Sequence, residues 1–365
     1  GAVVVNQGAG QTFAIAPTGG YQIADVLVDG GSVGAVTSYP FTNVTANHTI
    51  AASFTAITTT SLASNNNPST IGSSVTLTAS VTPIPTVGGT VTFLDSGSPK
   101  GTGTTNGSGV ATLVTSAMDV GSHSLTARFE GDVSHALSTS SPPLIQVVNT
   151  IPTSTSLVSN NNPSILGSSV TLTATVTPIP FLGGTVTFLD NGLSIGTGTT
   201  DGSGLATLAT SALAVGSHPL TARFEGTAHH ALSTSSPALS QVVNTIPTSA
   251  SLASNNNPST FGSSVTLTAS VTPIPTVGGT VTFLDNGLSI GTGTTNGGGV
   301  ATLTTSTLAL GSHPMTARYE GSAGYLTSTS SPALAQVVNA PVSTNTVNVG
   351  PAPGMITQGN PIRTV

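Results

Sequence analysis

The string GGTVTFLD occurs three times, at residues 88–95, 183–190 and 278–285, and each copy begins 95 residues after the previous one. A second string, SNNNPS, recurs with the same offset at residues 64–69, 159–164 and 254–259. No insertion breaks the register, so both strings belong to one repeated unit. We predict three units, at residues 57–150, 151–245 and 246–339, followed by a tail at residues 340–365.

Apolar and polar residues alternate in short runs within each unit. In the first unit, Val75, Leu77, Ala79 and Val81 alternate with Thr and Ser, which is the period of a half-buried β-strand. Turns rich in Gly and Pro separate about seven such runs, which is typical of an immunoglobulin-like β-sandwich. The predicted fold class is therefore all-β: tandem Ig-like β-sandwiches in a linear rod, with a smaller N-terminal β-module at residues 1–56.

The composition excludes several classes of function. Charged residues make up 4% of the chain, against about 25% in an ordinary soluble domain. The five Lys and Arg cannot form the basic patch that nucleic acid requires. The chain has no Cys, which rules out thiolate metal sites, and no apolar run approaches the ~18 residues of a membrane span. A surface so poor in charge associates readily, which suits a fibre.

Four polar positions change between the units. A site that every unit uses should persist in every unit, so we expect these four positions at the surface. They are Lys100, Asp119, Asp132 and His135 in the first unit, Ile195, Ala214, Thr227 and His230 in the second, and Ile290, Ala309, Ser322 and Tyr325 in the third.

Four other polar positions persist in all three units: Asp95, His123, Arg128 and Glu130 in the first, with their equivalents in the others. Arg and Glu two residues apart on a strand share one face, so we predict a solvent-facing ion pair, with the Asp where a strand meets a turn. A cation site is the alternative, although these carboxylates are few for Ca²⁺. The lone His is expected to be structural. No nucleophile, base or carboxylate pair converges, so we predict no catalytic residue, no metal and no cofactor.

The repeated unit resembles the bacterial Ig-like repeats of large surface proteins. The strings that carry the resemblance are TVTFLD at residues 90–95, GVATL at 109–113, GSHSLTARFEGD at 121–132 and SPPLIQVVN at 141–149. Their order is kept three times, over about three quarters of the chain. The resemblance implies a non-catalytic protein of the cell surface, because members of that family typically form the stalks of adhesins.

Residues 1–56 are similar to a different, small all-β repeat of bacterial surface proteins. The matching strings are VNQGAGQTF at residues 5–13, GYQIADVLVDGGSVG at 20–34 and YPFTNVTANHTIAASF at 39–54. In that family a further strand precedes the point where this chain begins. The resemblance therefore implies an incomplete module, and we interpret the chain, which starts at Gly1, as a processed or trimmed product.

These features predict an extracellular structural protein of the cell surface that assembles with copies of itself. We expect it to be a filament subunit that polymerises head to tail by strand addition, because a missing strand leaves an open edge for another chain. The predicted acceptor residues are Ala2, Val3, Val4 and Val5, and the predicted donor residues are Val342, Thr344, Thr346, Val347 and Val349.

Two other functions remain open. The chain is alternatively a segment of the stalk of a large adhesin, in which case the tail has no role in assembly. It is alternatively a carbohydrate-binding surface module whose partners are cell-surface or host glycans. Sugar platforms usually present exposed Trp or Tyr, whereas this chain has no Trp, and only the third unit carries Tyr among the repeats, at Tyr319 and Tyr325.

Overall fold

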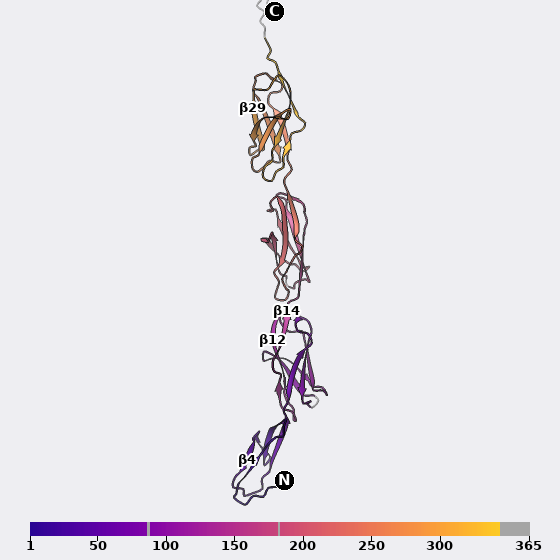
Figure 1. The fold of residues 1–365 in the computed structure, drawn as a ribbon, viewed down its shortest axis with the longest axis vertical. Coiled ribbons are helices and arrows are strands. Elements are labelled where there is room, and N and C mark those ends of the chain that lie inside the picture. Colours follow the sequence, from indigo (N-terminus) through magenta and orange to yellow (C-terminus); the bar gives the residue numbers. More distant parts are fainter. Residues whose placement is uncertain (86–87, 182, 344–365) are drawn as a thin grey trace, which may run out of the picture. The chain divides into compact units, whose positions relative to one another are not determined.

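The computed structural model describes residues 1–85, 88–181 and 183–343, and every regular element within these ranges is a β-strand (Figure 1). The all-β prediction is therefore confirmed for this part of the chain.

The N-terminal module contains five strands in two small sheets. One sheet pairs β1 with β4, and the other has the order β3-β2-β5. Asp29 and Gly30 join β2 to β3 with positive φ angles of 48° and 81°, which is the turn that the Asp-Gly pair predicts. The strands are β1 (Gln11–Ala14), β2 (Tyr21–Val28), β3 (Gly31–Gly34), β4 (Ser38–Phe41) and β5 (Ile50–Ala56).

The core of this module is thin. Among residues 1–55, Val26 is the one apolar side chain that is fully buried. Phe13 and Phe41 on the two-stranded sheet are half-buried, and Phe54 on β5 is exposed. Two small sheets with so little buried apolar area between them are marginal on their own, so a further strand would add a substantial share of the core.

The first repeat is a sandwich of two sheets, with strand orders β11-β8-β6 and β10-β9-β12-β14-β7, and β13 pairs with β12. Strand pairs are antiparallel except β14 with β7, which is parallel. The strands are β6 (Thr59–Ser64), β7 (Ser69–Thr70), β8 (Val75–Thr82), β9 (Thr90–Asp95), β10 (Ser98–Thr104), β11 (Val110–Thr115), β12 (Gly121–Phe129), β13 (Ser138–Thr139) and β14 (Leu144–Asn149).

The alternation seen in the sequence produces the core between the two sheets. Val75, Leu77, Ala79 and Val81, all on β8, are each at most 2% exposed. The intervening Thr and Ser of β8 point outward and are half-buried or exposed. In a chain without Trp, two phenylalanines supply the largest buried side chains on the facing sheet, Phe93 on β9 and Phe129 on β12.

The second and third repeats reproduce this sandwich, with equivalent strands 95 residues further along, as β8, β17 and β26 illustrate. Their strands are β15 (Ser154–Ser159), β16 (Ser164–Ile165), β17 (Val170–Thr177), β18 (Thr185–Asp190), β19 (Leu193–Thr199), β20 (Leu205–Thr210), β21 (Gly216–Phe224), β22 (Ser233–Thr234), β23 (Leu239–Asn244), β24 (Ser249–Ser254), β25 (Ser259–Thr260), β26 (Val265–Thr272), β27 (Thr280–Asp285), β28 (Leu288–Thr294), β29 (Val300–Thr305), β30 (Gly311–Tyr319), β31 (Ser328–Thr329) and β32 (Leu334–Asn339).

A side-chain amide extends the larger sheet of each repeat. In the third repeat, Asn257 Nδ2 donates to Ala335 O at 2.7 Å, and Asn257 Oδ1 accepts from Val337 N at 2.9 Å. The amide thus bonds β32 as a residue of a neighbouring strand would, just before β25 takes over that pairing. Asn67 and Asn162 make the same two bonds in the other repeats.

The residue at each junction, Ala56, Ile151 or Ile246, is hydrogen-bonded into the repeat that the junction leads into. Ala56 N donates to Ser134 O at 2.7 Å, and Ala136 N donates to Ala56 O at 2.8 Å. Ile151 and Ile246 form the equivalent parallel bridges, to His230 and Tyr325. Each repeat therefore fixes the backbone of its own first residues on both sides.

Candidate assembly site

The N-terminal module has an open groove of about 770 Å³. It is lined by residues of the N-terminal segment, by β1, by Phe41 at the end of β4, and by the segment that leads into β5. The residues that line it are Gly1, Ala2, Val3, Val4, Val5, Gln7, Gln11, Phe13, Phe41, Val44, Thr45, Ala46, Asn47, His48, Thr49 and Ile50.

All four predicted acceptor residues line this groove, but none of them lies in a strand. Val5 is half-buried, whereas Val3 is 53% exposed and Val4 is 95% exposed. Two apolar side chains at the groove are therefore largely in contact with water. Whether this segment receives a strand stays a prediction.

Aromatic rings form one wall of the groove. The ring of Phe13 lies edge-on to Phe41, with centroids 5.9 Å apart, and Tyr39 packs on the other ring edge at 5.0 Å. The imidazole of His48 lies over Phe41 at 5.0 Å. In the described part of the chain β1 pairs with β4 alone, so the other edge of β1 has no strand beside it.

A carboxylate fixes the loop at the rim of the groove. Asp29 Oδ2 lies 2.7 Å from His48 Nδ1, and Asp29 Oδ1 accepts from Thr49 N at 2.7 Å. The bond with His48 and then the bond from Thr49 hold the pKa of Asp29 below its usual value. This contact could not be predicted from the sequence, because nothing in the sequence indicates that residues 48–49 return to Asp29.

The predicted donor residues fall mostly beyond the described ranges. Val342 is described and is 90% exposed. Thr344, Thr346, Val347 and Val349 lie outside the residues that the structure describes.

The persistent Arg and Glu form the predicted ion pair. Arg128 Nη2 lies 2.9 Å from Glu130 Oε1, and the two side chains are 47% and 34% exposed. Thr92 Oγ1 on β9 also donates to Glu130 Oε1 at 2.6 Å. The Thr92 bond and then Arg128 lower the pKa of Glu130, although partial burial opposes them. The second and third repeats repeat the pair, which braces the outer face of each sandwich.

The persistent Asp and His are partners. His123 Nδ1 lies 2.8 Å from Asp95 Oδ2, and His123 Nε2 lies 2.9 Å from Asp119 O. His313 lies 2.7 Å from Asp285 Oδ2 and 2.9 Å from Ala309 O. These contacts agree with the structural role predicted for the histidine, which lies on a strand, β12 or β30. The pairing itself was not predicted, and its one signal in the sequence is that both residues persist at a fixed separation.

The expectation of a surface position was wrong for His135 and Asp132 and their equivalents in the other repeats, none of which is exposed. It was also wrong for Ile195 and Ile290, which are half-buried. The His135 side chain is 15% exposed, and His230 and Tyr325 are 2% and 9% exposed as whole residues. Each of them forms a backbone bridge at the junction that leads into its repeat, with Ala56, Ile151 or Ile246, and Tyr325 belongs to the core of the third repeat. A partly polar ring can be buried there because it has a hydrogen-bond partner or an edge at the surface, so exchange between His and Tyr does not imply exposure.

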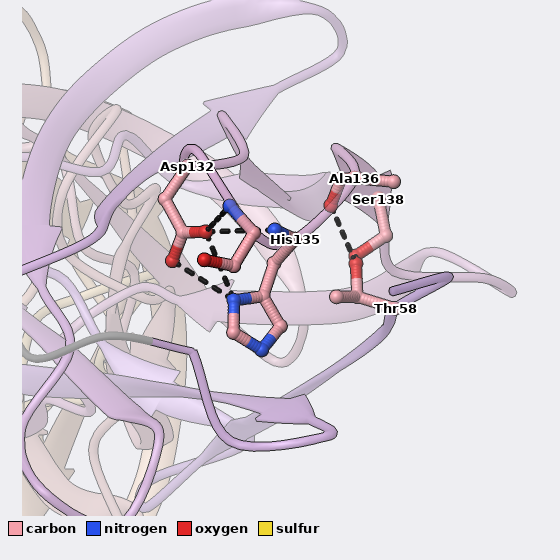
Figure 2. Close-up of polar contacts among 6 residues, drawn as sticks. Thr58, Asp132, His135, Ala136 and Ser138 are labelled. Carbon is pink, nitrogen blue, oxygen red and sulfur yellow. Dashed lines mark hydrogen bonds and ion pairs between the residues drawn. The ribbon is translucent and has the colours of Figure 1, made fainter. Parts of the chain in front are cut away.

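Asp132 organises the loop that carries His135 (Figure 2). Its Oδ1 accepts from the N–H groups of Ser134 and His135, each at 2.7 Å, and lies 2.9 Å from the ring Nδ1 of His135. On the adjacent segment, Thr58 Oγ1 donates to Ala136 O at 2.8 Å. In the second repeat, Thr227 Oγ1 accepts from His230 N at 3.0 Å, so the exchange from Asp to Thr keeps the loop acceptor.

The described residues contain no group of three or more His, Cys, Asp or Glu side chains arranged to hold a metal ion. Within the same ranges, no helix is long and apolar enough to cross a membrane. Tyr319 is 0% exposed and Tyr325 is 9% exposed, so these two rings do not form an exposed sugar platform on the third repeat.

Several solved structures align with the chain at low identity. A structure of a 1.5-MDa bacterial ice-binding adhesin is 16% identical, covers 77% of this chain and 98% of its own, and has a TM-score of 0.31. A putative membrane-anchored protein from Corynebacterium diphtheriae is 13% identical, with coverages of 91% and 95% and a TM-score of 0.26. The BSP domain of a biofilm-associated protein is 12% identical, with coverages of 77% and 66% and a TM-score of 0.23. Likenesses this weak carry no argument about function.

The family comparison is decisive where the structural likenesses are not. No curated protein matches the chain. The family model described as bacterial Ig-like domain (group 3) matches residues 59–149, 157–244 and 252–339. These three matches fall on the three sandwiches and span more than half of the sequence, so the chain belongs to the bacterial Ig-like domain family, group 3.

Proposed function

We propose that the chain is a non-catalytic structural protein of the cell exterior, in which the repeats supply length and lateral surface. The observation that carries this proposal is the repetition of one closed sandwich, with the same core and the same ion pairs, three times without an insertion. Chains built from such repeats extend by adding units, and each unit is stabilised by its own core. The proposed division is the one predicted from the sequence, with boundaries after residues 56, 150, 245 and 339.

Within this role, the chain is a filament subunit that joins its neighbour head to tail by strand addition. The N-terminal module supports this proposal on the acceptor side. Its β1–β4 sheet has two strands, the groove beside β1 is lined by Phe13 and Phe41, and Val3 and Val4 are exposed next to it. An added strand would bond the free edge of β1 and cover these apolar groups.

The sequence of residues 342–349 supports the proposal on the donor side. It reads VSTNTVNV, which is rich in β-branched residues and has no charge to oppose burial. In a strand, Val347 and Val349 fall on one face, and Thr346 and Asn348 fall on the other. The valine face is the one that enters the groove. A contact between two different surfaces of the same chain does not close on itself, so it propagates a fibre.

The test uses two double variants that add the same charge to opposite faces of the donor. Val347→Asp/Val349→Asp should abolish filaments in electron micrographs of the purified chain, because two carboxylates cannot enter an apolar groove unpaired. Thr346→Asp/Asn348→Asp is the matched control and should still assemble, because Thr346 would take part in the added strand through its backbone while its side chain faces away from the groove. Deletion of residues 341–365 should leave folded chains that do not assemble.

Two outcomes would overturn the assembly mechanism. Filaments with an unchanged axial repeat after the deletion would exclude the tail as donor. A wild-type chain that stays monomeric at high concentration would favour the other structural reading, a segment of an adhesin stalk. A glycan array with the same monomer tests the carbohydrate-binding reading directly.

A further inference from the structure

We propose that the first and third repeats each contain a proton-operated clasp, in which one histidine holds three segments of the sandwich together only while both of its ring nitrogens carry a proton. The histidines are His123 and His313. The clasp would make the stability of the repeats respond to the pH outside the cell, which goes beyond a purely structural role.

The positions of the acceptors carry this inference. His313 lies on β30, its Nδ1 is 2.7 Å from Asp285 Oδ2 at the end of β27, and its Nε2 is 2.9 Å from Ala309 O in the preceding loop. A carboxylate and a carbonyl oxygen only accept hydrogen bonds, and a neutral imidazole has a single N–H. Both bonds can therefore form together only when His313 is an imidazolium.

The first repeat has the same arrangement on independent residues. His123 Nδ1 is 2.8 Å from Asp95 Oδ2, and His123 Nε2 is 2.9 Å from Asp119 O. The residue that supplies the loop carbonyl differs, because Asp119 of the first repeat corresponds to Ala309 in the third. The clasp needs only the backbone carbonyl at this position, so the replacement leaves it intact.

The carboxylate side of the clasp is sheltered from water, whereas the bond to the loop carbonyl is exposed. The side chains of His313 and Asp285 are 13% and 21% exposed, and those of His123 and Asp95 are 14% and 12% exposed. Water therefore replaces a lost bond to the carboxylate poorly, and loss of one proton leaves either the carboxylate or the loop carbonyl without its protein donor.

The charged residues near the two histidines differ at two positions, because Lys100 and Asp119 of the first repeat correspond to Ile290 and Ala309 of the third. The charge of Lys100 lowers the pKa of His123, whereas Asp119 acts on it through its backbone carbonyl. In the first repeat, Lys100 Nζ on β10 lies 3.5 Å from the same Asp95 oxygen that His123 contacts. The third repeat has Ile290 at that position. From the last strand, the registered neighbours of the two histidines are the uncharged Gln146 and Gln336. Asp95 therefore keeps a cation after His123 is deprotonated, whereas Asp285 does not.

The pKa directions agree with this geometry. The bond to Asp119 O and then the Asp95 carboxylate raise the pKa of His123, while burial and Lys100 lower it in part. The bond to Ala309 O and then Asp285 raise the pKa of His313, with burial opposing. A histidine whose pKa is raised on folding contributes its full stabilisation below its unfolded pKa of about 6.5, and loses it as the pH rises through the folded value.

The pKa of the carboxylate sets the lower limit of the pH range in which the clasp stabilises the repeat. Burial acts to raise the pKa of Asp95, but the hydrogen bond with His123 and the charges of His123 and Lys100 lower it overall. A carboxyl group with a lowered pKa contributes its stabilisation above its unfolded value of about 3.9, and loses it as the pH falls through the folded value. The clasp should thus be strongest in mildly acidic surroundings.

The first measurement is an NMR titration of the imidazole groups in the full chain, with resonances assigned from His123→Gln and His313→Gln variants. Both histidines should titrate above the ordinary midpoint of about 6.5. His123 should titrate below His313, because of Lys100. The Lys100→Ile variant, which gives the first repeat the residue type of the third, should move His123 toward His313. Midpoints at or below the ordinary value for both residues would overturn the proposal.

The second measurement separates a proton-dependent clasp from a merely structural histidine. Hydrogen exchange of β30, in peptides that contain Met315 and Tyr319, is compared between wild type and His313→Gln and corrected for intrinsic rates. The other two repeats have Leu and Phe at these two positions, so such peptides report the third repeat alone. At pH 6 the variant should exchange faster by roughly threefold to tenfold, the effect of about one hydrogen bond. Near pH 8.5 the difference should shrink below about twofold, by the same measure.

The control is His229→Gln, which replaces an exposed histidine of the second repeat and should leave these peptides unchanged at both pH values. An equal ratio of wild-type to His313→Gln exchange at pH 6 and pH 8.5 would show that His313 only fills space, and would overturn the clasp. Neither measurement depends on assembly, so the clasp and the filament proposal can fail separately.

Discussion

Single glycines set the turn that precedes one strand of each sandwich. Gly299, before β29, has a φ of +74°, and a Cβ there would lie 2.7 Å from Val271 O on β26. Gly109 and Gly204 occupy the equivalent turns with the same constraint. A left-handed backbone conformation already disfavours other residues, and the contact with a backbone carbonyl removes the space for a side chain. The close approach of this turn to the central strand therefore requires glycine.

Gly299→Ala should destabilise the third repeat by more than about 2 kcal/mol, because the strain of the positive φ and the clash with Val271 O act together. Chemical denaturation followed by tyrosine fluorescence measures this, since among the repeats only the third carries tyrosine, at Tyr319 and Tyr325. The signal of Tyr21 and Tyr39 in the N-terminal module is common to the variant and its control. The control, Gly297→Ala, lies two residues earlier, where nothing is within 4 Å of an added Cβ. Equal effects of the two substitutions would contradict this account of the turn.

At the scale of the strand, a side-chain amide bonds the last strand of the larger sheet in each sandwich. It does so just before the backbone of the same segment begins to pair with that strand. Asn257 bonds Ala335 O and Val337 N of β32 before β25 takes over the pairing. The fully buried Gln336 on β32 returns the contact, because its Nε2 donates to Asn256 O at 2.8 Å. Two amides thus join the first part of the repeat to its last strand.

Asn257→Ala should lower the stability of the third repeat by about 1 kcal/mol, the net value of a typical hydrogen bond, because the two bonds it removes are partly accessible to water. Asn256→Ala is the matched control. Its side chain makes one long contact, Nδ2 to Ser264 O at 3.5 Å, and the backbone oxygen used by Gln336 is retained, so we expect less than about 0.5 kcal/mol. Denaturation midpoints measure both, and a larger loss for Asn256→Ala would refute the assignment.

The strands and the core could be predicted from the sequence because both depend on local alternation. Val75, Leu77, Ala79 and Val81 are buried, and the residues between them point outward, as the two-residue period of a strand requires. The partnership of Asp95 with His123 could not be predicted, because it depends on β9 and β12 lying side by side. The surface prediction for His135 failed for a related reason: exchange between repeats reports tolerance for a side chain, whereas burial is set by the residues packed around it.

At the scale of the whole molecule, the same few polar contacts stabilise each repeat, and they involve its persistent carboxylates. Glu130 is bonded to Arg128 and Thr92, and Asp95 is bonded to His123. Among the described residues, no cluster of potential metal ligands is present. We predict from these contacts that bonds between protein groups stabilise the repeats.

Removal of divalent cations should leave the thermal unfolding of the chain unchanged. Melting curves with and without a chelator should agree within about 1 °C, because a metal that bound only the folded state would raise the melting temperature by mass action. A fall of several degrees on chelation, restored by added Ca²⁺ or Mg²⁺, would contradict this expectation.

The parallel pairing of β7 with β14 has a consequence for a chain under tension. Ser69 pairs with Val148 and Thr70 pairs with Asn149, and both strands run in the same direction. Force that enters at the start of the first repeat and leaves at its end pulls these two strands past each other along their length, which loads their hydrogen bonds together in shear. Bonds loaded together resist better than bonds opened one at a time, as in a zipper. Forced unfolding is governed by the unfolding rate, so this short pairing would set how long each repeat withstands a steady pull.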